Sequence, residues 1–408
     1  MTRTILHCDL NSFFASVELL SYPELRDKPV AVSGDASARH GIILAKNEAA
    51  KRCGVVTAET IYQARRKCPQ LVLLPPHHAL YEEYSRRVNA IYADYTDIVE
   101  TFGIDESWLD LTGSCHLFGG DAVKVADTLR ARVREELGLT LSVGVSFNKV
   151  FAKLGSDYRK PDATTLISKE NWQKIVFPLP VTDLLFVGRA AADVLSQYGV
   201  HTIGQLAACR AEMLETLLGK LGLQLHAYAN GLDDAPVTGE GGREAVKSVG
   251  NGTTYSRDIT RLDDARTAIT VLADSVAMRL RRHGMYCGGV QLTIRNAQFK
   301  NISRQKQLGF TTHLTREIAA AAVELLQSAW HPGEPIRMLT VTAIHLTAER
   351  DAYRQLDLLS EGTQVSERQE KVERAMDAIR SKYGKSSISY GAGALAEKFG
   401  GNNTGHDK

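Results

Sequence analysis

The sequence feature that most constrains the fold of this chain is a pair of adjacent carboxylates in an apolar segment. Asp105 and Glu106 lie within TFGIDESWLD, residues 101–110. The apolar pairs at 98–99 and 108–109 indicate two strands, which places residues 103–106 at the tip of a hairpin. Like charges at neighbouring positions of such a tip repel each other. The pattern therefore requires a compensating positive charge nearby.

Strand and helix patterns alternate through about residue 175. ILHCDL (5–10) predicts a short strand that carries Asp9 near its end, and SFFASVELL has helical spacing with Asn11 or Ser12 as its cap. Further strands are expected at 30–34, 42–45 and 140–149, and further helices at 48–53, 81–95, 121–137 and 149–157. This order predicts an α/β or α+β domain.

The rest of the chain changes character twice. Short, glycine-punctuated helices are expected over 181–236, and the polar, glycine-rich stretch 237–245 is typical of a linker. Strands are then expected at 288–296 and 338–347, and helices at 262–283, 314–330 and 366–383. The final residues have little to bury, which favours disorder. The whole is expected to be an α+β multidomain protein.

The charge distribution and the cysteine content limit which binding partners and which cellular compartment are expected. Residues 241–350 carry 15 basic and 9 acidic side chains, a local charge of +6 in a chain of net charge +2. This favours a polyanion-binding face, although a solvated charged surface explains the count equally well. The six cysteines include no CxxC pair, and no apolar run approaches membrane-spanning length. We expect a cytoplasmic protein without a signal peptide, disulfide framework or membrane contact.

Asp9 extends the acidic pattern around the hairpin. If its strand lies beside the hairpin in one sheet, three carboxylates converge at one edge. Hard divalent ions such as Mg²⁺ take such oxygen ligands, and two of them can support phosphoryl transfer. Turn or cap roles explain the same residues, and the pattern alone leaves both interpretations open.

Four motifs resemble those of the Y-family translesion DNA polymerases, the DinB/UmuC group. They are CDLNSFFASVE (8–18), IDESWLD (104–110), SVGVSFNKVFAKLGSD (142–157) and RKPDA (159–163), in the order of the family. The likeness runs through about residue 350. It implies a right-hand polymerase whose parts are palm and fingers over 1–180, a helix-hairpin-helix thumb over 181–236, a linker over 237–245, an α/β little finger over 246–350, and a clamp-binding segment with a flexible tail over 351–408.

The same resemblance assigns the reaction and its metals. Asp9, Asp105 and Glu106 would hold two Mg²⁺ ions, with the backbone carbonyl of Leu10 as a further ligand. The primer 3′-hydroxyl would attack the α-phosphate of an incoming deoxynucleotide. Catalysis of this kind rests on positioning and charge neutralisation. The expected activity is template-directed, low-fidelity translesion synthesis without proofreading.

Further family positions concern the nucleotide. Phe14 matches the steric gate, a ring that leaves no room for a ribose 2′-hydroxyl, although Phe13 and Phe14 both suit a helix core. The backbone amides of Asn11–Phe14 suit phosphate binding at a helix start. Lys51 and Lys160 match cations that hold the β- and γ-phosphates, and a solvated surface role is the alternative for each.

DNA contacts are expected in the last two folded domains. LFVGRAAADVL (185–195) and YGVHTIGQLA (198–207) resemble paired helix-hairpin-helix elements, which present backbone N–H groups to phosphates. Gly188 and Arg189 are the candidates there, Phe186 stands where many members have glycine, and ordinary helix turns are the alternative. The candidates for phosphate contacts in the +6 segment are Arg295, Lys300, Arg304 and Lys306.

The pentapeptide QLDLL, residues 355–359, resembles the motif by which bacterial polymerases dock on the sliding clamp. Gln355 would make polar contacts at the rim of a clamp pocket. Leu356, Leu358 and Leu359 would supply the apolar contact, and packing onto the little finger is the alternative. The expected partners are primer–template DNA, a deoxynucleotide and the clamp, with the chain itself a monomer.

Two other functional classes compete with this interpretation. A catalytically silent DNA-binding paralogue would lack a metal carboxylate, but all three are present. A metal-dependent nuclease or nucleotidyl cyclase on a related palm is the other alternative. The thumb-like and little-finger-like segments after residue 180 argue against it, because a cyclase needs no grip on a duplex. Primer extension with Mg²⁺ separates all three classes.

Overall fold

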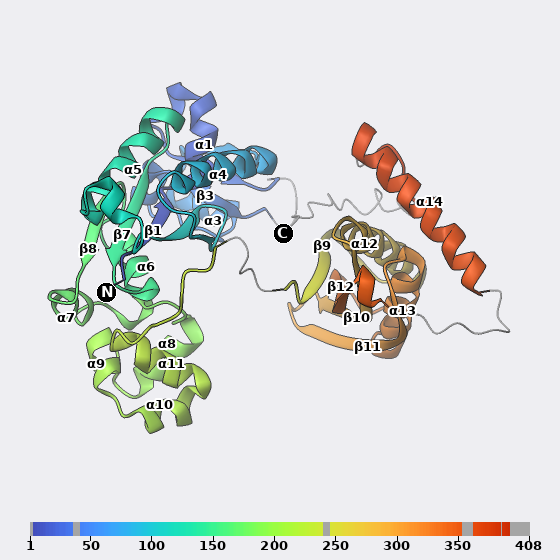
Figure 1. Ribbon diagram of the computed structural model, residues 1–408. Coiled ribbons are helices and arrows are strands. Elements are labelled where there is room, and N and C mark those ends of the chain that lie inside the picture. The colour runs from blue at the N-terminus through green and yellow to red at the C-terminus, as the bar shows by residue number, and fades with distance from the viewer. Residues whose placement is uncertain (1–2, 36–40, 240–244, 353–361, 385, 392–408) are drawn as a thin grey trace. The chain divides into compact units, whose positions relative to one another are not determined.

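The structure is a computed structural model that describes residues 3–35, 41–239, 245–352, 362–384 and 386–391 (Figure 1). The chain forms two compact units, the first ending at Arg243 and the second beginning at Glu244. Each unit has its own hydrophobic core. None of the helices in these ranges is long and apolar enough to cross a membrane. All six cysteines are free thiols.

A five-stranded sheet forms the centre of the first unit, in the order β5-β6-β1-β7-β8. The strands are β1 (Ile5–Leu10), β5 (Val99–Thr101), β6 (Glu106–Asp110), β7 (Leu141–Ser146) and β8 (Thr164–Ile167). Central β1 pairs antiparallel with β6 and β7, and β5 pairs antiparallel with β6. The predicted hairpin around Asp105 is therefore confirmed.

Strand β1 is buried on both faces, so its alternating side chains serve two layers. Leu6 and Cys8 join the core made with three helices, whereas Ile5 and His7 face a fourth helix, α6. The three helices are α1 (Phe13–Ser21), α4 (His78–Ala93) and α5 (Ala122–Leu137), and α6 spans Lys149–Tyr158. By the same alternation, Asp9 lies on the α6 face.

A small three-stranded sheet, in the order β3-β2-β4, forms a second part of the first unit. It contains β2 (Val30–Ser33), β3 (Ile43–Lys46) and β4 (Val72–Leu74), with α2 (Glu48–Arg52) and α3 (Ile61–Lys67) around a core of its own. The Asn47 side chain caps α2, and Thr60 with Gln63 forms a capping box on α3. Two 3-10 turns, Pro23–Leu25 and Cys115–Phe118, complete this half of the chain.

Short helices after residue 170 share a third core (Figure 1). They are α7 (Trp172–Val176), α8 (Arg189–Gln197), α9 (Ile203–Ala208), α10 (Ala211–Leu218) and α11 (Lys220–Ala229), with a 3-10 turn at Val181–Asp183. Helices α8 and α9 begin inside the two segments predicted to be paired hairpin elements, 185–195 and 198–207, and each ends one or two residues beyond its segment. A capping box at Thr202 starts α9.

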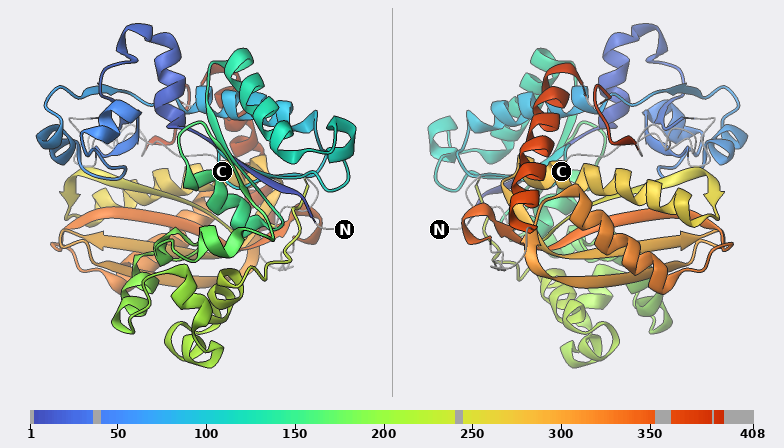
Figure 2. Two further views of the ribbon diagram at one scale, coloured as in Figure 1. Left: turned by 90° about the vertical axis from the view of Figure 1, so that its left-hand side faces the viewer. Right: turned by 90° about the vertical axis from the view of Figure 1, so that its right-hand side faces the viewer.

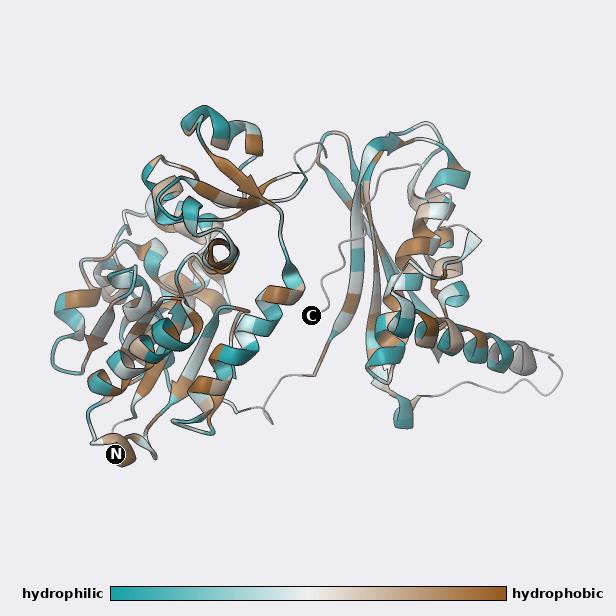
Figure 3. Ribbon diagram, turned by 90° about the horizontal axis from the view of Figure 1, so that it is seen from above, coloured by the Kyte–Doolittle hydropathy of each residue, from teal (hydrophilic) through white to brown (hydrophobic). Residues whose placement is uncertain are grey.

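The second unit is an antiparallel sheet, in the order β11-β10-β12-β9, with helices packed on one face (Figures 2 and 3). Its elements are β9 (Ser248–Ile259), α12 (Leu262–Arg282), β10 (Met285–Asn296), β11 (Asn301–Thr312), α13 (Thr315–Ala329) and β12 (Ile336–Ala348). Strands β9 and β11 are not anticipated by the sequence patterns. Most of β11 is exposed, so it carries no apolar alternation to detect.

Helix α14 (Gly362–Tyr383) packs on α12, after a 3-10 turn at Glu349–Asp351. Arg281 of α12 pairs with Glu373 and Asp377 of α14, and Arg380 of α14 pairs with Asp274 of α12. The compact unit thus continues past residue 350, where the sequence patterns end the folded domains. Hydrophobic periodicity does not predict the contact between α12 and α14, because ion pairs form a large part of that contact.

Candidate active site

A cavity of about 390 Å³ in the first unit gathers most of the catalytic, metal-binding and nucleotide-binding residues predicted from the sequence. The predicted residues that line it are Asp9, Leu10, Asn11, Phe13, Lys51, Asp105, Glu106 and Lys160. The remaining lining residues are Ser12, Leu44, Ala45, Lys46, Glu48, Thr57 and Lys153. Stretches far apart in the chain meet here, so the fold assembles one site from the separate motifs.

The sheet itself brings the three carboxylates together. Asp9 and Glu106 are directly opposite each other in the antiparallel pairing of β1 with β6. Side chains of directly opposite residues project from the same face of a sheet. Asp105 follows at the hairpin tip, where its carbonyl oxygen accepts a hydrogen bond of 3.0 Å from the backbone N–H of Leu10. The predicted convergence of the acids at one edge is therefore present.

Two lysines provide the positive charge that these carboxylates require. The Lys160 ammonium lies 2.7 Å from Asp9 Oδ2. The Lys153 ammonium lies 3.1 Å from the same oxygen and 2.6 Å from Glu106 Oε2. Both lysines also pair with Asp157, at 3.2 Å for Lys153 and 2.6 Å for Lys160. The cluster is thus a network of alternating charges and not a bare group of acids.

The two carboxyls of the hairpin tip titrate in opposite directions. Burial, reinforced by the charges of Asp9 and Glu106, raises the pKa of Asp105 to about 6. Burial also opposes ionisation of Glu106, but hydrogen bonds from His7 and Lys153 outweigh it and lower the pKa of Glu106 to about 2. Asp105 is therefore the member of the cluster that an additional cation would relieve most.

Sequence reasoning missed His7 and Lys153. His7 is fully buried, with Nδ1 at 2.8 Å from Ser156 Oγ and Nε2 at 3.2 Å from Glu106 Oε2. Burial lowers the pKa of His7, which keeps the ring neutral at physiological pH. A signal for Lys153 exists in the sequence, because Lys153 and Asp157 are four residues apart and share a face of one helix. Only the packing of α6 on the sheet shows that this face meets Asp9.

The donor set fits hard divalent ions, which prefer carboxylate and carbonyl oxygens. Burial and, after it, the charges of Asp9 and Glu106 raise the pKa of Asp105, and a bound cation would offset both effects. The acids are not already arranged as a coordination shell. Within the described ranges, no group of three or more His, Cys, Asp or Glu side chains is placed to hold a metal ion. Instead, the ammonium groups of Lys153 and Lys160 contact the carboxylates Asp9 and Glu106.

The residues at the start of α1 have distinct environments. Phe13 is buried in the core, while Phe14 is partly exposed and stacks on Tyr81. Phe13 lines the cavity and Phe14 does not. The Asn11 side chain donates to Ser142 Oγ and accepts from the backbone N–H of Asp162, so it holds the cavity wall together.

Lys51 reaches the cavity from the small sheet and its helices. Its side chain is 55% exposed, and its ammonium is 3.7 Å from Glu48. Lys46, which sequence reasoning did not single out, lines the same wall and donates to Thr57 Oγ1 at 3.0 Å. With Lys153 and Lys160, the cavity presents four ammonium groups, a charge pattern suited to a polyanion such as a triphosphate.

The hairpin candidates lie at the start of α8. Gly188 is the N-cap of this helix, Arg189 is its first residue, and both are exposed. A Cβ atom at Gly188 would meet nothing within 4 Å, so the backbone is open to close approach. Phe186 has a left-handed backbone conformation, which favours glycine, with φ 70° and a side chain 51% exposed.

The four cations of the second unit do not share one face of the sheet. Arg295 lies opposite Asn301 and donates to its side chain, on the face away from the helices. Arg304 and Lys306 lie opposite the buried Leu292 and Val290, which puts them on the helix side. Lys306 pairs there with Glu324 of α13. The predicted single basic face is thus divided, and Lys300 is exposed at the β10–β11 turn.

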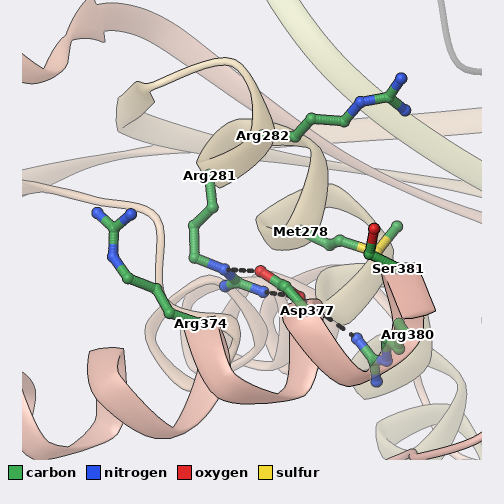
Figure 4. A pocket seen from close by; sticks show the side chains of 7 residues that line it. All are labelled: Met278, Arg281, Arg282, Arg374, Asp377, Arg380 and Ser381. Carbon is green, nitrogen blue, oxygen red and sulfur yellow. Dashed lines mark hydrogen bonds and ion pairs between the residues drawn. The ribbon is translucent and has the colours of Figure 1, made fainter. Parts of the chain in front are cut away.

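The predicted clamp-binding residues, 355–359, lie outside the described residues. The second unit contains another cavity, of about 530 Å³ (Figure 4). It is lined by Met278, Arg281, Arg282, Arg374, Asp377, Arg380 and Ser381. Arg281 and Arg380 are turned onto Asp377 in Figure 4, so carboxylates of the fold already engage these guanidinium groups.

Comparison with known proteins identifies the class. Residues 8–157 match the impB/mucB/samB family, and residues 246–358 match the C-terminal domain of the impB/mucB/samB family. A solved Y-family DNA polymerase chimera has a similar fold, with a TM-score of 0.74 and 20% identity over 85% of this chain and 99% of that chain. The fold is that of a Y-family DNA polymerase.

Relatives narrow the class to one group. DNA polymerase IV of Acetivibrio thermocellus is 45% identical over 391 residues, 96% of this chain and 97% of that protein. DNA polymerase IV 1 of Bacillus subtilis is 37% identical over 96% of this chain and 93% of its own length. The chain therefore belongs to the DNA polymerase IV group of the Y family, which are DNA-directed DNA polymerases.

Proposed function

We propose that this chain performs low-fidelity, template-directed translesion synthesis, transferring a deoxynucleotide to a primer 3′-hydroxyl. One observation carries the proposal. Asp9, Asp105 and Glu106 meet Lys153 and Lys160 in a single cavity of the first unit. Proofreading is not part of the proposed activity.

Two Mg²⁺ ions are the proposed cofactors. Asp9, Asp105 and Glu106 would hold them, with the Leu10 carbonyl as a further ligand. When bound, such ions neutralise charge on the reacting phosphate and lower the pKa of an attacking hydroxyl. The support for this assignment is the all-oxygen donor set and the raised pKa of Asp105.

The residues of the chain divide the remaining work. Lys153, held by Asp9, Glu106 and Asp157, keeps two of the carboxylates in a fixed relative orientation. Lys160 and Lys51 would bind phosphate oxygens of the nucleotide, supported by backbone N–H groups at the start of α1. Phe14 would exclude the ribose 2′-hydroxyl. Positioning and fixed charge of this kind account for most of the catalysis in phosphoryl transfer.

The proposed domains follow the elements. The five-stranded sheet would be the palm, the small sheet with α2 and α3 the fingers, and α8 to α11 the thumb. The second unit would be the little finger, and α14 extends it. Phosphates of primer–template DNA would contact the exposed backbone and cations, namely Gly188, Arg189, Arg295, Lys300, Arg304 and Lys306.

The sliding clamp is the proposed protein partner, through Gln355, Leu356, Leu358 and Leu359. Tethering by a short peptide raises the effective concentration of the enzyme at the primer end. The chain itself would act as a cytoplasmic monomer. Simultaneous alanine substitution of Leu358 and Leu359 should remove stimulation by the clamp and leave clamp-free extension intact.

Primer extension tests the function. We expect the chain to extend a primer with deoxynucleotides and Mg²⁺, and to stop when the metal is chelated. Asp105→Asn and Glu106→Gln should each lower extension by at least about a hundredfold, because each removes a carboxylate that would hold the metal ions, and those ions would stabilise the transition state. Glu136→Gln is the matched control, since Glu136 is a half-exposed carboxylate outside the cavity that pairs with Arg132.

Two results would contradict the proposal in different ways. Near-normal extension by both cavity variants would remove the metal assignment. Tight duplex binding without any extension by the unaltered chain would instead favour a DNA-binding protein without catalysis.

A further inference from the structure

A buried polar network lies behind Phe14, and none of the roles proposed above uses it. Its centre is Glu18, which is 2% exposed and follows Phe14 by one turn of α1. A carboxylate buried at this level is costly unless it is paired and hydrogen-bonded. The contacts of Glu18 therefore indicate what the carboxylate contributes.

Glu18 holds two residues at the start of α4. The hydroxyl of Tyr81, which is fully buried, donates a close hydrogen bond to the Glu18 carboxylate. His77 Nδ1 lies 2.9 Å from Glu18 Oε1. The backbone N–H of His77 in turn donates to the Tyr81 hydroxyl oxygen at 3.0 Å. The Tyr81 hydroxyl is thus fixed from two sides.

The ring of Tyr81 supports Phe14. The two rings are stacked, with centroids 4.1 Å apart and an angle of 13° between their planes. The His78 ring meets Phe14 edge-on, at 5.9 Å and 83°. Tyr81 therefore covers one face of the Phe14 ring, and the position of the Phe14 ring depends on the position of the Tyr81 ring.

The hydrogen bond also determines the state of Tyr81. Burial and the neighbouring carboxylate raise the pKa of Tyr81 well above its usual range. The hydroxyl therefore remains protonated at neutral pH and can donate to Glu18. An apolar residue at position 18 would fill the space without fixing the hydroxyl, which would let the Tyr81 ring shift.

We propose that Glu18 is a positioning residue for sugar selection: through Tyr81 it holds the Phe14 ring where that ring bars the ribose 2′-hydroxyl. The inference rests on the proposed role of Phe14 as the gate. Sugar discrimination by a ring demands accurate placement, because the two sugars differ at this position by a single hydroxyl oxygen. Glu18 adds that accuracy without touching the nucleotide.

The test compares insertion of a deoxynucleotide and of the matching ribonucleotide by single-turnover kinetics. Tyr81→Phe keeps the ring and removes the hydroxyl, and Glu18→Leu keeps the volume and removes the acceptor. Both should raise the relative kcat/KM for the ribonucleotide by about tenfold. Glu18→Gln keeps an acceptor oxygen and should restore most of the discrimination. Phe14→Ala sets the upper limit of the effect.

Val88→Ala controls for loss of packing alone. Val88 is buried in the same core, on α4, and has no part in the network. Its variant should melt at a lower temperature with unchanged sugar discrimination. If Phe14→Ala admits ribonucleotides while Tyr81→Phe and Glu18→Leu stay within about twofold of the unaltered chain, the inference is overturned and the gate survives. If Phe14→Ala changes nothing, both the gate and the inference fail.

Discussion

The two units each bury a cluster of charges, and they satisfy those charges to different extents. In the second unit, Glu373 is 1% exposed and accepts hydrogen bonds from Arg281, the Tyr390 hydroxyl and both the backbone and side chain of Thr315. In the first unit, burial and the neighbouring carboxylates Asp9 and Glu106 oppose the ionisation of Asp105 and raise its pKa to about 6. One cluster is complete, and the other has room for a further cation.

The difference separates a structural role from a functional one. Thr315 begins α13, whose N-cap residue Leu314 offers no side-chain cap. Glu373 supplies that missing cap from α14, so the carboxylate joins two helices. Asp105 joins nothing in this way. Groups with perturbed pKa values in a cavity are typical of functional sites, whereas fully paired buried charges hold elements together.

Matched carboxylate-to-amide substitutions should show the largest contrast. Glu373→Gln removes the charge that balances buried Arg281 and should lower the free energy of unfolding of the second unit by about 3 kcal/mol. Asp105→Asn removes a repelled charge and should leave the stability of the first unit equal or higher. Denaturant unfolding followed by hydrogen exchange, read separately on α12–α14 and on β1–β6, measures both. Equal destabilisation by the two variants would break the comparison.

The pH dependence of stability is the next largest effect. The pKa of Asp105 in the fold is about 6, above its ordinary 3.8, so folding disfavours the charged form. As the pH falls from about 7 to about 4, protonation removes this penalty, and the contribution of Asp105 to stability rises by about 2 kcal/mol. Asp105→Asn should lack this rise. Parallel pH profiles for the two proteins would contradict the assignment.

Glu106 gives a trend of the opposite sign at lower pH. Its pKa of about 2 lies below its ordinary 4.5, so its stabilising contribution is complete above 4.5 and is lost as the pH falls toward 2. The two carboxyls can therefore be told apart by the pH range in which each variant departs from the unaltered chain.

Added metal should produce the smallest of these shifts. A divalent ion that binds only the folded protein stabilises it by about 1.4 kcal/mol at ten times its dissociation constant. We expect Mg²⁺ to raise the melting temperature of the unaltered chain and of Glu373→Gln alike, but not that of Glu106→Gln. A shift that persists in Glu106→Gln would place the ion elsewhere.

The motifs allow accurate prediction of β1, α1 and the hairpin of the first unit because each of these elements is local, whereas α3, β4 and β8 were not expected. Alternation and helical spacing in ILHCDL and SFFASVELL are properties of a few consecutive residues, and the hairpin follows from its flanking strands. Prediction fails where the signal is weak or spread out. Strand β11 is exposed along most of its length, and the contact of α14 with α12 depends on ion pairs between residues about a hundred positions apart.

The sequence by itself determined many of the chemical groups that this protein brings to its site: the acids, the two aromatic rings and two of the four lysines were predicted from it. Only the tertiary structure decided which of those groups touch. Lys153 and Lys160 reach Asp9 because α6 packs on β1. Arg295 on β10 and Arg304 on β11 face opposite sides of the sheet, because successive side chains of each strand alternate between its two faces. A local sequence pattern indicates the face of its helix or strand on which a residue lies. Contacts between distant segments depend instead on how whole helices and strands pack together.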